Sequence, residues 1–325
     1  MNDPMIWVRA LHFAATILAA GASLFRVFVA EPAFREADNN AGLAALVRSQ
    51  LAWIVWVSLV MVFISGTAWL VLQAQRMSDL SLAAVLSEGT VWTVLTQTGF
   101  GQAWVARFVL LVLFIGVLLL SGFKKQMKSG LAGAAGLVGG GLVGALAWAG
   151  HAAAGSDSDI EGTLHLTADI LHLLAAAAWV GALVPLAILL AAAWRIGDGF
   201  SVAVACQATL RFSTLGIVSV GTLVATGLVN SWVLAGSVHA LFDTDYGRLL
   251  LLKIALFLIM LSIAAINRLY LTPRLVQDID IDATRNALRQ LRNNSLIEAT
   301  LGAIILVIVG ILGTLPPGVH EQDSE

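Results

Sequence analysis

The chain has 325 residues, of which 59% are hydrophobic and only 12% charged. This composition lacks the charged surface that a soluble protein of this size needs, and it suits a chain that repeatedly crosses a lipid bilayer. The net charge of −2, without a basic stripe, excludes a nucleic-acid-binding protein, and the single cysteine, Cys206, excludes an internal disulfide and a multi-thiolate metal site.

Apolar segments long enough to span a bilayer follow one another along the chain. They lie at about 5–30, 50–74, 101–123, 130–150, 164–194, 211–236, 248–271 and 296–315. The stretches between them carry Pro, Gly, Asn and charged residues, as in EPAFREADNN and GFKKQMKSG, whereas a closed β-barrel would show short alternating segments. We therefore predict an all-α polytopic membrane helix bundle with eight transmembrane helices, in which residues 1–325 form a single integral membrane domain.

The positive charges are distributed unevenly between the two ends of these helices. If the amino terminus lies outside, most of the 18 Lys and Arg residues fall on the inner face, and those left outside are Arg9, Arg76, Arg107, Arg248 and Lys253. Because positively charged loops stay in the cytoplasm, we expect both termini to face the exterior or periplasm. The first apolar stretch is longer than a usual signal core, so we expect it to remain as the first helix.

The segment at 130–150 is rich in glycine. Gly136, Gly140 and Gly144 are spaced four residues apart and therefore fall on one face of a helix. Such a smooth face predicts that a neighbouring helix approaches closely there.

All six histidines lie toward the exterior in this topology: His12, His151, His165, His172, His239 and His320. The outer loops also hold several acidic residues: Asp157, Asp159, Glu161, Asp243 and Asp245. Imidazole and carboxylate groups gathered on one side of the membrane indicate an outward-facing site for a cation.

His165, Asp169 and His172 share one face of the fifth predicted helix. At 100° per residue they fall within an arc of about 60°. The two histidines are separated by a rise of about 10 Å, which is awkward for one ion bound to both. We expect instead that His172 joins ligands from other helices, such as His12, and that Asp169 ligates the ion or orients an imidazole. His165 and His151 then form an outer capture step.

Simpler interpretations of these polar residues stay open. Polar groups near the start of a helix, including Thr163 or Thr167, stabilise the helix end without binding anything. Ionisable groups at membrane depth are costly and normally face cavities, which favours a functional role. Lys253 and Arg107 either neutralise Asp169 or extend toward the membrane surface.

The order of these motifs resembles the CopD family of bacterial copper resistance and copper uptake membrane proteins. The segments that carry the resemblance are RALHFAATILAAGASLF, AGHAA, HLTADILHLLAAAAWVGAL, RFSTLGIVSVGTLVATGLVNSW, TDYGRLLLLKIALFLIMLSIAAINRLYLTP and LRNNSLIEATLG. The resemblance implies an inner-membrane protein of eight helices that acts with a periplasmic CopC-like copper-binding protein and moves copper inward, rather than an enzyme. It favours as copper-handling positions His12, His151, His165, Asp169 and His172.

Copper handling is accordingly our leading hypothesis for the protein. Imidazole and carboxylate suit Cu(II), and the scarcity of Cys and ordered Met argues against a wholly soft Cu(I) pathway, so the oxidation state stays open. Two alternatives are a membrane redox protein that holds haem b between His12 and His172, and a scaffold without a cofactor.

Several other residues have two interpretations each. Met61 and Met260 either fill the core or serve Cu(I) along a path. Glu298 and Arg268 either pair with each other or mark the inner end of an ion or proton path. The tryptophans Trp148 and Trp179 are candidate walls of the outer site, and the loop with His239 and Asp243 is a candidate docking surface.

Overall fold

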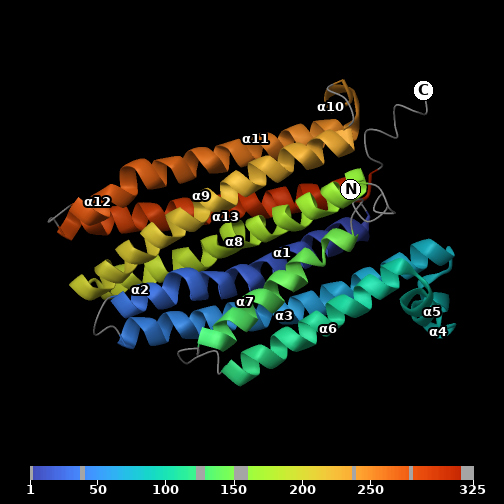
Figure 1. Ribbon diagram of the computed structural model, residues 1–325, viewed down its shortest axis with the longest axis horizontal. Coiled ribbons are helices and arrows are strands. Elements are labelled where there is room, and N and C mark those ends of the chain that lie inside the picture. Colours follow the sequence, from blue (N-terminus) through green and yellow to red (C-terminus); the bar gives the residue numbers. More distant parts are fainter. Residues whose placement is uncertain are drawn as a thin grey trace.

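The computed structural model of the protein describes residues 3–36, 41–121, 129–149, 160–235, 239–277 and 281–315. The regular elements in these residues are helices, which confirms the predicted all-α membrane bundle (Figure 1). In chain order they are α1 (Pro4–Phe25), η1 (Arg26–Ala30), α2 (Glu31–Glu36), α3 (Ala41–Ser78), α4 (Leu82–Ser87), α5 (Thr90–Gln97), α6 (Gly99–Ser121), α7 (Ser129–Gly144), η2 (Ala147–Ala149), α8 (Ile160–Ile196), α9 (Gly199–Ala235), α10 (Ala240–Asp243), α11 (Asp245–Ile266), η4 (Asn267–Leu271), α12 (Thr272–Gln277) and α13 (Ile281–Leu312).

Seven helices in the described residues are long and apolar enough to cross a membrane: Pro4–Glu36, Gly42–Ser78, Gly99–Ser121, Ile160–Ile196, Gly199–Leu234, Asp245–Leu275 and Ala283–Leu312. The remaining predicted crossing corresponds to the shorter apolar helix α7, of 16 residues. Arg9 on α1 donates a hydrogen bond to the carbonyl of Gly313 (2.8 Å), so the first and last described helices begin and end at the same end of the bundle. An even number of passes fits this arrangement; eight crossings and periplasmic termini stay predictions.

Several helices extend beyond the apolar segments that the sequence marks. α9 begins at Gly199 rather than near 211, because Asp198 caps its first turn by accepting a hydrogen bond from the backbone N–H of Ser201 (2.7 Å). That bond lowers the pKa of the Asp198 carboxyl below its usual range. Hydropathy marks only the length of helix that lies in lipid, whereas the backbone hydrogen bonds continue into the polar region.

α1 and α8 form the centre of the bundle and are its most buried long helices (Figure 1). They cross with their backbones in contact at Gly21 and Gly181. A Cβ atom on Gly21 would lie 2.4 Å from the carbonyl oxygen of Ala177, and one on Gly181 would lie 2.3 Å from that of Ile17. Only glycine fits at either position, because neither backbone can move away without separating the helices.

The glycines of α7 are approached by side chains of neighbouring helices rather than by a backbone. A Cβ on Gly136 would meet a side-chain methyl of Leu24 at 3.7 Å, and one on Gly140 or Gly144 would meet side chains of α8 at 3.4 and 3.3 Å. These are contacts with leucine and isoleucine side chains of α1 and α8. The glycine-mediated crossing belongs to α1 and α8 instead.

Replacing Gly181 by alanine is expected to destabilise the bundle, because the added methyl group collides with the α1 backbone. Overpacking of this kind costs about 1–3 kcal/mol. Gly221→Ala on α9 is the matched control, since nothing lies within 4 Å of a Cβ there. Thermal unfolding in detergent should show a lower midpoint for Gly181→Ala alone; equal midpoints for both variants would contradict the backbone contact.

Candidate functional site

The imidazole of His172 on α8 is oriented by a threonine of α9. Nδ1 of His172 lies 3.0 Å from the hydroxyl oxygen of Thr226, and that hydroxyl donates its hydrogen to the carbonyl of Thr222 (2.6 Å). Because the threonine has one hydrogen and has already donated it, Nδ1 must be the donor in the first contact. The Nε2 atom of the neutral ring therefore keeps an open lone pair, which is the form that binds a metal ion.

Asp169 lies one turn before His172 on the same helix. Its Oδ1 accepts a long hydrogen bond, of 3.4 Å, from the side-chain amide of Asn230 on α9. The charge of Lys253, on α11, acts electrostatically on both Asp169 and His172. Three helices therefore bring an imidazole, a carboxylate and an ammonium group into one polar cluster.

The amide oxygen of Asn230 adds a potential oxygen ligand to this cluster. It is buried and has no hydrogen-bond partner within the described part of the chain. We name the group formed by His172, Asp169, Asn230, Thr226 and Lys253 the α8–α9–α11 cluster. It offers one nitrogen and several oxygen donors, a set suited to Cu(II) and other borderline cations.

His165 lies nearer the start of α8 and is buried, with 7% of its surface exposed. The charge of Glu161 acts on it from one turn away. Its separation from His172 by seven residues corresponds to a rise of about 10 Å, so it stands outside bonding reach of an ion held by His172.

His12, on α1, has both ring nitrogens engaged by other helices. Arg107 on α6 contacts Nε2 through its Nη2 atom, and a guanidinium only donates, so Nε2 accepts. Nδ1 then carries the proton and donates to the hydroxyl of Ser65 on α3 (2.9 Å), which donates in turn to the carbonyl of Met61 (2.5 Å). The imidazole is therefore neutral, and its Nε2 atom is already occupied by the cationic Arg107 side chain.

Two indole rings complete the surroundings of this guanidinium. The rings of Trp69 and Trp104 meet His12 edge-on, with centroids 5.6 and 5.5 Å away, and Cζ of Arg107 lies 4.0 Å from the centroid of the Trp104 ring. Arg107 is only 3% exposed, and its Nε and Nη1 atoms have no hydrogen-bond partner among the described residues. Cation–π attraction and a contact with one imidazole thus stabilise the charge of Arg107. No carboxylate in the described part of the chain pairs with it. Lys253 and Arg107 are the two cations considered as partners of Asp169, and the charge of Lys253 is the one that acts on this carboxylate.

The structure does not bring the predicted ligands into one group. Within the described ranges, no set of three or more His, Cys, Asp or Glu side chains is close enough to hold a metal ion. His12 contacts α3 and α6 whereas His172 contacts α9, so the expected joint site of these two histidines is not formed. The same separation leaves the haem b alternative without support. His151 lies outside the described residues.

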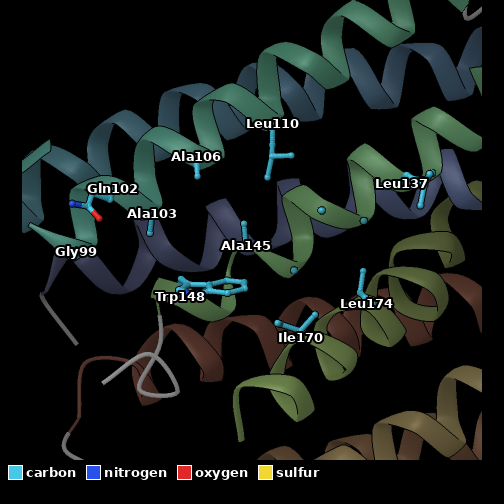
Figure 2. Close-up of a pocket in the computed structure, with 14 residues that line it drawn as sticks. Gly99, Gln102, Ala103, Ala106, Leu110, Leu137, Ala145, Trp148, Ile170 and Leu174 are labelled. Carbon is cyan, nitrogen blue, oxygen red and sulfur yellow. The ribbon is translucent and has the colours of Figure 1, made fainter. Parts of the chain in front are cut away.

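A mostly apolar cavity lies apart from the residues described so far. It has a volume of about 800 Å³ and lies between α6, α7 and the start of α8, with walls of glycine, alanine and aliphatic side chains (Figure 2). Trp148 lines this cavity. Trp179 is buried and packs edge-on against Phe257, with 6.0 Å between the ring centroids. The cavity lining contains no ionisable side chain.

Some residues of these clusters were not predicted from the sequence. Ser65, Trp69 and Trp104 occupy positions that apolar membrane helices commonly give to small or aromatic residues. A polar face on α9 could have been predicted from the spacing of its polar residues. Thr222, Thr226 and Asn230 are four residues apart, which places their side chains on one face of the helix.

Spanning-length helices that enclose imidazole, carboxylate and ammonium groups define a polytopic membrane protein with ionisable sites inside the bundle. Its N-terminal part, residues 1–159, matches the family model described as Copper resistance protein D-like, N-terminal domain, and residues 206–312 match that described as Copper resistance protein D. The chain belongs to the copper resistance protein D family.

Curated relatives extend along most of the chain. Copper resistance protein D of Pseudomonas syringae pv. tomato is 30% identical over 321 residues, 98% of each chain. Inner membrane protein YebZ of Escherichia coli (strain K12) is 30% identical over 315 residues, 96% of this chain and 98% of that protein. Copper transport protein CutJ of Bacillus subtilis (strain 168) is 31% identical over 229 residues, 70% of this chain and 39% of that protein. No solved structure matches.

The comparisons confirm the family and the cellular location that the sequence predicts. The chain is a multi-pass protein of the bacterial inner membrane and a member of a copper resistance and transport family. Two of these relatives are named for copper resistance and copper transport.

Proposed function

We propose that the protein accepts copper at the α8–α9–α11 cluster, on the periplasmic side, and passes it toward the cytoplasm. The observation that carries the proposal is the hydrogen bond from His172 to Thr226, which leaves Nε2 of the imidazole open beside the Asp169 carboxylate. The family to which the chain belongs supplies the identity of the ion.

Lys253 stabilises this cluster when copper is absent. Its ammonium balances the Asp169 charge when no ion is bound, and it is repelled when copper takes that place. The empty and loaded clusters thus differ in the position of one flexible side chain. We infer that His165 and His151, nearer the membrane surface, capture the ion before it reaches His172.

Delivery by a periplasmic CopC-like protein is part of the same proposal. The loop at α10 projects His239 and Asp243, which are exposed and joined by a contact of 3.0 Å between Nε2 and Oδ2. A second imidazole–carboxylate pair on the outer surface is suited to meet a copper-bearing partner.

Copper uptake by proteoliposomes is the direct test of this function. Vesicles that contain the wild-type protein should accumulate copper above the level of empty vesicles when it is offered in the form that the protein transports, either Cu(II) or, with a reductant, Cu(I). The comparison of the two forms decides the oxidation state. Uptake no greater than that of empty vesicles would refute transport, and a Soret band in the purified protein would revive the haem alternative.

A further inference from the structure

A second polar cluster is buried in the bundle, between α13 and the segment η4. Glu298 of α13 is 1% exposed, and its Oε1 accepts a hydrogen bond from the side-chain amide of Asn267 (2.8 Å). The amide of Asn294 donates in turn to Oδ1 of Asn267 (2.6 Å). The other carboxyl oxygen of Glu298, Oε2, is buried and has no partner among the residues that the structure describes.

Elsewhere in the bundle a buried glutamate is paired with cations. Glu31 accepts hydrogen bonds from Arg26 (3.1 Å) and from two atoms of Arg48 (2.9 and 2.7 Å). Glu298 forms no ion pair in the described part of the chain, although the sequence places Arg268 close to it. Arg268 directs its guanidinium to the hydroxyl of Ser213 on α9 (2.6 Å), so the expected Glu298–Arg268 pairing is not formed.

The other charged groups on elements that pack against α13 are engaged or exposed. Arg9 bonds to Gly313, Arg26 to Glu31 and Arg292 to Asn293, Lys253 acts on Asp169, and Arg195 and Arg274 are exposed. A buried carboxyl group without a nearby cation is tolerated when it carries a proton, because it is then neutral. When it loses the proton, its negative charge is left uncompensated. The open Oε2 atom is where such a proton binds.

One face of α11 and η4 connects Glu298 with the α8–α9–α11 cluster. Lys253, Met260 and Asn267 are each seven residues apart in α11 and η4, so they share a face and succeed one another at steps of about 10 Å. Met260 is fully buried, and its methyl carbon would lie 3.8 Å from a Cβ on Gly302, one turn from Glu298. The face thus runs from Lys253 past a thioether to the carboxyl group.

The backbone geometry of η4 is a second indication of a functional site. Asn267 begins a π-helical turn, and its carbonyl accepts a hydrogen bond from the hydroxyl of Thr272 (2.8 Å). Turns of this kind are rare inside α-helices and are frequent at functional sites. Here the wider turn presents the Asn267 side chain to Glu298.

We propose that Glu298 is a proton-binding site that takes up and releases a proton as copper moves along this face. An O–H bond forms at Oε2 on uptake and breaks on release, so the step needs no oxidant or reductant. Proton binding stands on the geometry alone, and only its coupling to copper rests on the proposed function.

Infrared spectroscopy of the purified protein tests proton binding directly. The spectrum recorded as a function of pH should contain the carbonyl band of a protonated carboxyl that Glu298→Gln lacks. Glu88→Gln, the same change at an exposed position between α4 and α5, should keep it. Glutamine preserves the size of the side chain and an acceptor for Asn267, and retained copper binding reports that the variant is folded. An unchanged band in Glu298→Gln would overturn the proposal.

Proteoliposomes that contain a pH-sensitive dye test the coupling. Copper addition should drive a proton flux in the wild type and in Glu88→Gln, and Glu298→Gln should lose it while still binding copper. A full flux in Glu298→Gln would refute coupling. If the wild type takes up no copper while the infrared band still depends on Glu298, the proposed function fails and the proton site stands.

Discussion

Alanine in place of His172 is expected to remove the copper site of the α8–α9–α11 cluster. The substitution deletes the nitrogen ligand and leaves a carboxylate and an amide, which hold copper poorly alone. Loss of a partner that merely orients a ligand costs about 10–100-fold in metal affinity, so loss of the ligand itself should cost at least that much. Equilibrium dialysis against a copper chelator, with metal analysis of the purified protein, measures the change.

Three further variants make this result specific. Asp169→Asn should weaken binding because it removes the charge that attracts the ion. Thr226→Val keeps the imidazole but removes the acceptor for its Nδ1 proton, and it should lower affinity by about 10–100-fold. His239→Ala deletes an exposed histidine and should leave the affinity unchanged in the absence of a partner protein. Equal affinities for His172→Ala and the wild type would place copper elsewhere.

The sequence predicts the crossing helices well because hydrophobic length is a local property. Seven of the eight predicted segments correspond to helices of spanning length, and the face shared by His165, Asp169 and His172 follows from helix periodicity. Helix ends are less predictable. α3 begins at Ala41 and α9 at Gly199, because polar residues continue a helix outside the bilayer at little cost.

Which neighbour a helix face meets is not a local property, so the sequence does not predict it. His12 and His172 lie on helices that touch at Gly21 and Gly181, yet their side chains point to different partners. Periodicity gives the angle between two residues of one helix, but it does not give the rotation of that helix against the next. The partner of Glu298 shows the same limit, since Asn267 and Arg268 are about 100° apart and only Asn267 faces the carboxyl group.

Replacing His12 by alanine is expected to destabilise the bundle without removing the copper site. The substitution leaves the buried guanidinium of Arg107 without the hydrogen-bond acceptor that His12 provides. Removal of one partner from a buried charged contact typically costs about 3–5 kcal/mol. Thermal unfolding followed by tryptophan fluorescence is well suited to this test, because Trp69 and Trp104 flank the contact.

A double variant separates this structural role from a role in copper binding. With Arg107→Met added to His12→Ala, the unpaired guanidinium charge is removed as well, so most of the lost stability should return. Copper affinity should stay at the wild-type value in the double variant, because His172 and Asp169 contact other helices. If His12→Ala instead unfolds at the wild-type temperature and loses copper, then His12 is a ligand and Arg107 must leave it when the ion binds.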